Sequence, residues 1–475
     1  MNLLPSVPVS FFRAWTMLLL SVALSGMLPA QPQLPHTLSP AEKVYGLSKF
    51  WQEANYNFVY INKVDREKWE QDYQQLITEV QATESDYAYY RLLQQFCATL
   101  EDGHTNVYFP KSTDSLIYTT WFGDYRLILD NIEGKAIVTH VNQSKKDEIP
   151  IGTEITKVNG LPTRAYADQF VKPYIASSTD YILESSTIAQ LLRSPIGTTY
   201  QLELKKPNGE LMDLEVTHGD ITDTEIYPPY EQRDLLDFKW INDEIAYVSL
   251  NSFAYEKIDT LFIEKLPEIR KAKKLIVDLR YNGGGSTGVG TAILQYLTHD
   301  QELYGSAYQS RLHIPAFKAW GKWTTPQDTV NVSEEDKKWN KQALLTYQDS
   351  YFHKFPYHAT KLDLATEERI VIPTVLLIGN GTASAAEDFL IAADNQKHMI
   401  KIGQPTFGST GQPMVFDMPG GGSARICTKK DTYPDGREFV GVGIQPDIYV
   451  KKSLDDFIHD KDPALEKAIE YLENP

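Results

Sequence analysis

Four short apolar runs, separated by helical patterns, constrain most strongly what this chain can fold into. They read EIAYVSL, KKLIVDL, TVLLIG and MIKIG, all beyond residue 235, and their length and composition are typical of buried strands. A stretch with helical periodicity follows each of the first three. Because strands that alternate with helices indicate helices packed on a sheet, residues 235–475 are predicted to form an α/β domain.

Two regions of different character precede this domain. Residues 115–220 contain short alternating runs such as AIVTHV and YQLELKKPNGELMDLEV, which predict a β-rich module. Residues 31–110 begin with a Pro/Gln/Ser-rich leader and continue as a helical region, in which Gly103 is suited to cap the third helix. The helical spacing is carried by two sets of residues, Trp69, Tyr73, Leu76 and Val80, and then Tyr89, Leu92, Phe96 and Leu100.

An aromatic and polar segment, residues 305–365, interrupts the α/β pattern. We interpret this segment as an insertion into the α/β domain. Two roles remain open for it, a lid over the functional site and a helical excursion on the surface.

The first thirty residues have the composition of a secretory signal peptide. Residues 1–30 carry one charge, Arg13, followed by the apolar stretch AWTMLLLSVALSGMLPA. That stretch is short for a membrane-spanning helix, no later segment is long enough, and no cysteine follows it to carry a lipid. We therefore expect cleavage near Ala30 and an exported protein, periplasmic or secreted, without stable membrane insertion.

Charge and cysteine usage exclude several classes of function. The net charge is −17, and −18 without residues 1–30, which disfavours nucleic acid and anionic membrane surfaces as partners. Two cysteines, Cys97 and Cys427, are too few for a disulfide framework or a cysteine-based zinc site. A single bridge between them stays open, and neither a metal site nor an organic cofactor is expected. The sequence does not indicate the oligomeric state.

A serine between two alanines stands where a predicted strand turns into a helix. Ser384 lies in GNGTASAAEDFLIAAD, residues 379–394, directly after TVLLIG. The free N–H groups and positive dipole end of a helix N-terminus favour developing negative charge, and the small neighbours leave room for a substrate. Ser384 is therefore a candidate nucleophile, although a helix N-cap is the alternative interpretation.

Two further features supply what a serine nucleophile needs. The run LIVDLRYNGGGS, residues 275–286, ends a predicted strand in three glycines, whose N–H groups could form an oxyanion hole with the amide that follows Ser384; a loose loop is the alternative. His104 lies in EDGHT, at a bend after a predicted helix. A histidine in such a place is a candidate general base.

In this order, the segments DLRYNGGGS, GNGTASAAEDF, GQPTFGSTGQP and GVGIQPDIYV resemble the C-terminal processing (tail-specific) serine peptidase family. EDGHT is similar to the same position in its tricorn-core branch, and the resemblance covers roughly residues 95–450. It implies a ClpP/crotonase-like α/β core with an inserted PDZ-like domain. It also implies hydrolysis of peptide bonds in unfolded or C-terminally presented polypeptides.

The resemblance assigns roles to individual residues. Ser384 matches the nucleophile, and Gly284 or its neighbour Gly283, with the amide of Ala385, matches the oxyanion hole. One branch of the family has a Ser–Lys dyad with its lysine in a TFGxG turn, but here Ser409 stands at that position. The lysine base is therefore absent.

The tricorn-core branch uses a histidine base, which His104 fits, although Gly103 replaces the serine that precedes it there. That branch orients its histidine through a glutamate shortly before the G-V/I-x-P-D turn. Val440 aligns at this place, with Glu438 two residues away. Glu438 is therefore the candidate orienting acid.

Residues 115–220 contain GTEITKVNGLPT and SPIGTTYQLELKKPNGE, which resemble strand segments of PDZ domains. PDZ domains bind extended peptide ends as an added strand, whereas a spacer that only shapes the cleft is the alternative. Taken together, the sequence predicts an exported serine endopeptidase without cofactor.

A non-catalytic protein that binds peptides or small ligands on the same scaffold remains the alternative, as in the retinoid-binding interphotoreceptor proteins. An unrelated α/β hydrolase is disfavoured, because Ser384 is not in a G-x-S-x-G turn.

Overall fold

The computed structural model describes residues 34–474. The predicted signal peptide, residues 1–30, lies outside the described residues. Within the described part of the chain, no helix is both long and apolar enough to cross a membrane.

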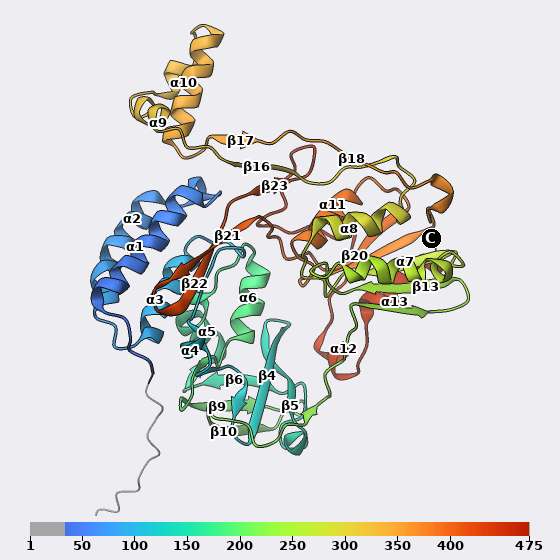
Figure 1. The fold of residues 1–475 in the computed structure, drawn as a ribbon. Coiled ribbons are helices and arrows are strands. Elements are labelled where there is room, and N and C mark those ends of the chain that lie inside the picture. The colour runs from blue at the N-terminus through green and yellow to red at the C-terminus, as the bar shows by residue number, and fades with distance from the viewer. Residues whose placement is uncertain (1–33, 475) are drawn as a thin grey trace, which may run out of the picture. The chain divides into compact units, whose positions relative to one another are not determined.

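A six-stranded sheet forms the centre of the C-terminal half, and the four predicted strands are all part of it (Figure 1). Its first strand is antiparallel to the second, and the other neighbours are parallel. The mixed α/β class predicted from the sequence is therefore confirmed. In sheet order the strands are β12 (Leu236–Trp240), β13 (Ile245–Leu250), β14 (Lys274–Asp278), β19 (Thr374–Ile378), β20 (Met399–Gly403) and β24 (Ile448–Tyr449).

Helices cover both faces of this sheet. Successive side chains of a strand point to opposite faces, so those of β14 pack against different helices. Leu275 and Val277 of β14 pack in one cluster with α7 (Lys257–Ile269), α8 (Thr287–Leu294) and α11 (Ala385–Ala392). Ile276 packs in the other cluster with α13 (Pro463–Glu473). The near-continuous apolar runs of the sequence follow from this burial on two sides.

The parallel pairing of β14 and β19 positions the functional site. The two strands are neighbours, with Asp278 paired to Leu377. Their carboxyl ends therefore meet at one edge of the sheet, where open α/β sheets bind their ligands. The glycine-rich turn follows β14, and the turn that carries Ser384 follows β19.

The N-terminal helical region shares its core with strands from the other end of the chain. Buried residues of its helices cluster with Met418, Ala424 and Ile426, and β1 pairs with β22 in the sheet β1-β22-β21. The elements are α1 (Pro40–Asn57), α2 (Arg66–Gln81), α3 (Asp86–Ala98), β1 (Asn106–Tyr108), β21 (Pro413–Met418) and β22 (Gly422–Cys427).

The predicted helix end at Gly103 is wrong. Helix α3 ends at Ala98, and Glu101, with φ of 50°, takes the left-handed conformation that follows it. Gly103 serves a different purpose, because a Cβ atom there would lie 2.7 Å from Cε1 of Phe407. This close approach joins the turn before His104 to the turn at residues 406–409.

Residues 117–227 form a β-rich module that contains an eight-stranded sheet and a buried cluster of its own. Two helices, α5 (Thr163–Phe170) and α6 (Asp180–Ala189), accompany its sheet. The longer strands in sheet order are β10 (Leu211–Thr217), β9 (Thr199–Lys205), β6 (Glu154–Val158), β5 (Lys135–Asn142) and β4 (Tyr125–Ile132), followed by the short β3 (Trp121–Phe122). Its short strands are β2 (Ile117–Tyr118), β7 (Leu161–Pro162), β8 (Ser194–Pro195) and β11 (Ile226–Tyr227), and the short helix α4 (Lys111–Asp114) precedes the module.

The remaining strands and α-helices lie mostly in the segment between α8 and β19, and two of them, β23 and α12, come later in the chain. Strand β16 pairs with β17 and with β23, and β15 pairs with β18. The elements are β15 (Glu302–Leu303), β16 (Ala307–Arg311), α9 (Pro315–Gly321), α10 (Glu334–Tyr347), β17 (Phe352–Lys354), β18 (Thr360–Lys361), β23 (Lys430–Thr432) and, near the C-terminus, α12 (Leu454–Ile458).

Candidate active site

Ser384 occupies a strained turn between β19 and α11. Its backbone angles, φ of 55° and ψ of −121°, lie in a region that residues with a side chain rarely adopt. Such strain persists where the surrounding structure enforces it, and it clusters at functional sites. The residue takes the N-cap position of α11, as its sequence context indicates. The sharp turn is the geometry that presents a nucleophile above a sheet.

A buried glutamate holds this turn in place. The N–H of Ser384 donates to Oε2 of Glu387 over 3.0 Å, while Oε1 accepts from Thr406 Oγ1 at 2.6 Å and from the N–H of Gly408 at 2.8 Å. Burial raises the pKa of Glu387 to about 8. Glu387 was not among the predicted site residues, although an acid three residues after a helix-capping serine is the pattern of a capping box.

The glycine turn lies directly against Ser384. A Cβ atom on Gly284 would come within 2.7 Å of Ser384 Cβ and 2.9 Å of the Ala385 nitrogen. The φ of Gly284 is 94°, which also favours glycine at this position. The structure therefore brings Ser384, Ala385 and Gly284 together, and no side chain on the turn fills the space between them.

Backbone N–H groups at this contact differ in their availability. The N–H of Gly284 donates to Asn282 Oδ1 at 3.0 Å. Within residues 34–474, the N–H groups of Gly283 and of Ala385, the first residue of α11, have no protein acceptor. Unpaired N–H groups at a helix N-terminus are suited to bind a developing negative charge.

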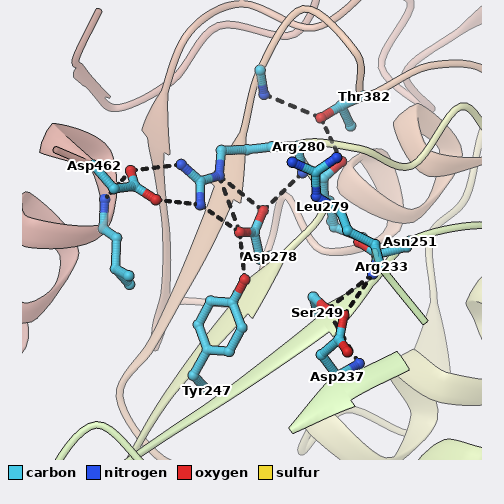
Figure 2. A network of polar contacts seen from close by, with 12 residues as sticks. Arg233, Asp237, Tyr247, Ser249, Asn251, Asp278, Leu279, Arg280, Thr382 and Asp462 are labelled. Atoms are coloured by element: carbon cyan, nitrogen blue, oxygen red, sulfur yellow. Dashed lines mark hydrogen bonds and ion pairs between the residues drawn. The ribbon is translucent and has the colours of Figure 1, made fainter. Parts of the chain in front are cut away.

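A network of polar contacts fixes the strand ends beneath the glycine turn (Figure 2). Asp278, at the end of β14, accepts from Tyr247 at 2.8 Å and from Arg280 at 2.6 Å. Arg280 also forms two hydrogen bonds to Asp462, at 2.7 and 2.8 Å. Thr382 Oγ1 donates to the carbonyl of Leu279 at 2.8 Å, which links the two turns to each other.

His104 lies in the turn between α3 and β1, and its imidazole is mostly buried. Its Nδ1 atom is 2.6 Å from Ser409 Oγ, a side chain with no solvent exposure. Burial lowers the pKa of His104 to about 4, and the positive charges of Arg425 and Lys429 contribute. The imidazole is therefore neutral at pH 7, the state in which it can accept a proton.

The turn at residues 406–409 connects the histidine to the serine. Gly408 binds Glu387, which holds the Ser384 amide, and the adjacent Ser409 binds His104. Among the described residues, no hydrogen bond joins the Ser384 hydroxyl to His104. Catalytic hydrogen bonds are often long in the absence of substrate.

The structure does not bring Glu438 to His104. The Glu438 carboxylate binds Lys430 and lies 3.8 Å from Lys63, and the side chain is about half exposed. Ser409 instead occupies the Nδ1 atom of His104. The geometry therefore offers a serine hydroxyl, and no support for Glu438, as the group that orients the histidine.

The β-rich module contacts the turn of His104 and the turn at residues 406–409 through residues 178–181. Ser178 Oγ accepts from the N–H of Gly103 at 2.9 Å and donates to Asp102 Oδ1 at 3.3 Å. Thr179 Oγ1 donates to the carbonyl of Phe407 at 3.3 Å, and the Tyr181 hydroxyl donates to the carbonyl of Thr406 at 2.5 Å. These contacts fix the module to the site.

The two cysteines are buried free thiols on either side of Thr105. The Cys97 thiol donates to the carbonyl of Thr105, and the N–H of Cys427 donates to the Thr105 hydroxyl. Among the described residues, His, Cys, Asp and Glu side chains form no group of three or more that could hold a metal ion.

Comparison with known proteins agrees with this geometry. The profile of peptidase family S41 matches residues 244–450, from β13 to just beyond β24. A carboxyl-terminal-processing protease of Picosynechococcus sp. is 22% identical over 76% of this chain and 72% of its own length. The carboxy-terminal processing protease CtpA of Bacillus subtilis is 26% identical over 56% of this chain and 45% of its own length.

Solved structures show a similar fold. Mature CPAF complexed with lactacystin superposes with a TM-score of 0.63 at 15% identity, over 92% of this chain and 98% of that one. The matched segment, residues 244–450, contains the strained turn of Ser384 between β19 and α11, called the Ser384 elbow below, and the glycine turn that faces it. Residues 244–450 therefore match peptidase family S41, the chain is similar to carboxyl-terminal-processing proteases, and it is a serine peptidase.

Proposed function

We propose that the chain is an exported endopeptidase that cleaves unfolded or C-terminally presented polypeptides with Ser384 as nucleophile and His104 as general base. Export is supported by the composition of residues 1–30. The observation that carries the mechanism is the Ser384 elbow, which is strained and packed against the glycine turn.

In the proposed reaction, Ser384 Oγ attacks the scissile carbonyl of the substrate. The N–H groups of Ala385 and of Gly283 bind the oxyanion, and Gly284 joins them if its N–H is released from Asn282. His104 accepts the serine proton and then donates it to the leaving amine. His104 then accepts a proton from a water molecule, which attacks the acyl-enzyme and releases Ser384.

The contact with Ser409 determines which nitrogen of His104 acts as the general base. Because Nδ1 is hydrogen-bonded to Ser409, Nε2 is the nitrogen available to the substrate and the nucleophile. A neutral hydroxyl fixes the ring, but it stabilises the protonated imidazole less than a carboxylate would. Ser409 thus takes over orientation in this site, without the charge of an orienting acid.

We also propose that the α/β domain is a ClpP/crotonase-like core and that the β-rich module is PDZ-like. The module would bind an extended segment of substrate as an added strand. Its hydrogen bonds to Thr406 and Phe407 support a place beside the site. Residues 305–365 would then form an insertion at the same site, since Tyr357 and His358 line a cavity together with Asp388 of α11.

The decisive test replaces the nucleophile. Ser384→Ala should reduce cleavage of an unfolded polypeptide more than about a thousandfold, because it removes the attacking atom. The fold should remain, which circular dichroism checks, and Ser333→Ala at the start of the distant helix α10 is a matched control that keeps full activity. Cleavage retained by purified Ser384→Ala would refute the assignment. A wild-type protein that binds peptides and cleaves none would favour the non-catalytic alternative.

A further inference from the structure

A cavity of about 610 Å³ is lined in part by Asp388 and Ala392 of α11, the helix that begins directly after Ser384, and the proposed reaction does not use it. Its walls come from α8, α11, the β16–β18 segment and the loop before β23. A cavity of this volume accommodates a large side chain and part of the backbone that carries it.

The walls continue from the elements that carry the reacting groups. Asp388 lies one helical turn after Ser384, and the N–H of Asp388 donates to the Ser384 carbonyl at 3.1 Å. Thr287 comes directly after the glycine-rich turn. Gln412 comes three residues after Ser409. Burial has the largest effect on the pKa of His104, and the charge of Lys429 lowers this pKa further. A substrate residue next to the scissile bond would therefore enter this cavity.

Charge in the cavity is unbalanced. Asp388 is 5% exposed and accepts hydrogen bonds from the hydroxyls of Thr287, at 2.6 Å, and Ser306. Asp431 has a fully buried side chain, and Lys429 Nζ lies 3.0 Å from its Oδ1. Burial raises the pKa of Asp431 to about 6, so the carboxylate stays largely ionised at neutral pH.

The ammonium group of Lys429 thus lies near two carboxylates, Asp431 and Asp388. Lys429 interacts electrostatically with Asp388 as well as with Asp431, and no ion pair within residues 34–474 involves Asp388 directly. A buried carboxylate without a matching cation is unfavourable. Neither oxygen of Asp431 accepts a hydrogen bond of good geometry from the described residues. Both observations favour a cationic occupant.

The cavity also offers aromatic surface to the stem of such a group. Tyr308, Phe355 and Tyr357 line the cavity, and their side chains are 43%, 40% and 39% exposed. The alkyl chains of lysine and arginine pack on apolar and aromatic surface while the charged head reaches a polar partner. An acidic side chain would gain less, because Lys429 is already held by Asp431.

We infer that this cavity is a specificity pocket for a lysine or arginine side chain of the substrate residue beside the scissile bond, with Asp388 as the group that receives the cation. The inference rests on the proposed peptidase mechanism. It adds a substrate class to that mechanism, and Asp388 is a specificity residue with no part in the proton transfers.

The test measures kcat/KM for the full-length mature protein on matched peptides that differ at one position. Lysine, arginine, norleucine, glutamine and glutamate are placed in turn on each side of the scissile bond. We expect lysine and arginine to exceed the neutral residues at least about tenfold on one side, and glutamate to be the poorest.

Asp388→Asn should lower kcat/KM for the lysine and arginine peptides at least about tenfold relative to the norleucine peptide, and so remove the preference, since the hydroxyl partners of Asp388 can still be satisfied. Asp213→Asn, an exposed change on the β-rich module, is the charge-matched control. If Asp388→Asn does not fold, Asp431→Asn removes the same charge from the adjacent wall and should weaken the preference in the same direction.

The possible failures are distinguishable. If no peptide of the set is cleaved and Ser384→Ala behaves like wild type, the proposed function itself fails. If peptides are cleaved with no preference for basic residues, or with a preference that Asp388→Asn and Asp431→Asn leave unchanged, the specificity pocket is refuted. A preference for glutamate would assign the pocket to Lys429 and also refute it.

Discussion

At the scale of single residues, the environment of His104, the proposed general base, predicts how cleavage responds to pH. Its Nδ1 atom binds a neutral hydroxyl, Ser409, and the charged groups that lower its pKa are the cations Arg425 and Lys429. The Asp102 carboxylate, two residues before His104, accepts hydrogen bonds from Thr105 and Ser178. The protonated imidazole thus lacks the carboxylate that stabilises it in a Ser–His–Asp triad.

Activity should therefore persist at acidic pH. Only the neutral imidazole accepts a proton, and an ordinary histidine would lose activity as the pH falls through about 6–7. Because the pKa of His104 is lowered to about 4, kcat/KM should remain high through that range and fall near pH 4. The measurement is a pH profile of kcat/KM on a short peptide, with folding monitored at each pH.

Ser409→Asp supplies the matched comparison. A carboxylate at Nδ1 would favour the protonated ring, so the acid limb should move to higher pH by at least about one unit. Equal profiles for wild type and Ser409→Asp, both falling near pH 6–7, would contradict the account of His104 given above. Ser384→Ala, without activity at any pH, excludes a contaminating peptidase.

At the scale of elements, the ends of β14 and β19 are the rigid base of the site. The network in Figure 2 ties β14 to β13 through Tyr247 and to the start of α13 through Asp462. Asp278 is 1% exposed, so its charge depends on Arg280. The glycine turn can approach Ser384 closely because the strand beneath it is fixed on both sides.

Arg280→Ala should destabilise the protein by about 3–5 kcal/mol, the range for breaking a buried ion pair and leaving one charge uncompensated. Urea unfolding followed by fluorescence gives the free energy of unfolding. Lys273→Ala removes an ion pair with Glu244 at 2.6 Å whose lysine is 71% exposed, and should leave the free energy of unfolding nearly unchanged, because solvent screens exposed ion pairs. Similar losses in the two variants would show that the network is not structural.

At the scale of the whole molecule, the β-rich module supports the catalytic turns as well as any substrate. Its Ser178 binds the N–H before His104, and Tyr181 binds Thr406. Removal of the entire module would therefore lower cleavage of short peptides too, through the loss of these contacts. A deletion alone cannot separate presentation of substrate from support of the site.

Ser178→Ala separates the two roles. It leaves the module in place but removes the acceptor for Gly103 N–H, so kcat should fall about 3- to 30-fold on short and long substrates alike, with KM nearly unchanged, as one hydrogen bond predicts. Thr199→Ala, on the exposed face of β9, is the control. A loss confined to long substrates would assign Ser178 to substrate presentation instead.

Local sequence patterns determined much of this protein. Periodicity identified the strands β13, β14, β19 and β20 and the helices α2 and α3, because burial of one or two faces leaves a repeat that needs no knowledge of distant contacts. The turn at Ser384 was visible for the same reason: a strand, small residues and a helix follow one another directly in the chain. The helix end at Gly103 was misplaced, because the close packing of Phe407 that requires a glycine there comes from the far end of the sequence.

What only the tertiary structure decided is the set of contacts between distant segments. Strands β21 and β22 complete the core of the N-terminal helices. Ser409, rather than Glu438, faces His104 across 305 positions of sequence, and Asp388 and Asp431 share one cavity with Lys429. Such pairings depend on how whole elements pack, and a side chain's partner then follows from burial and geometry, which no local pattern in the sequence records.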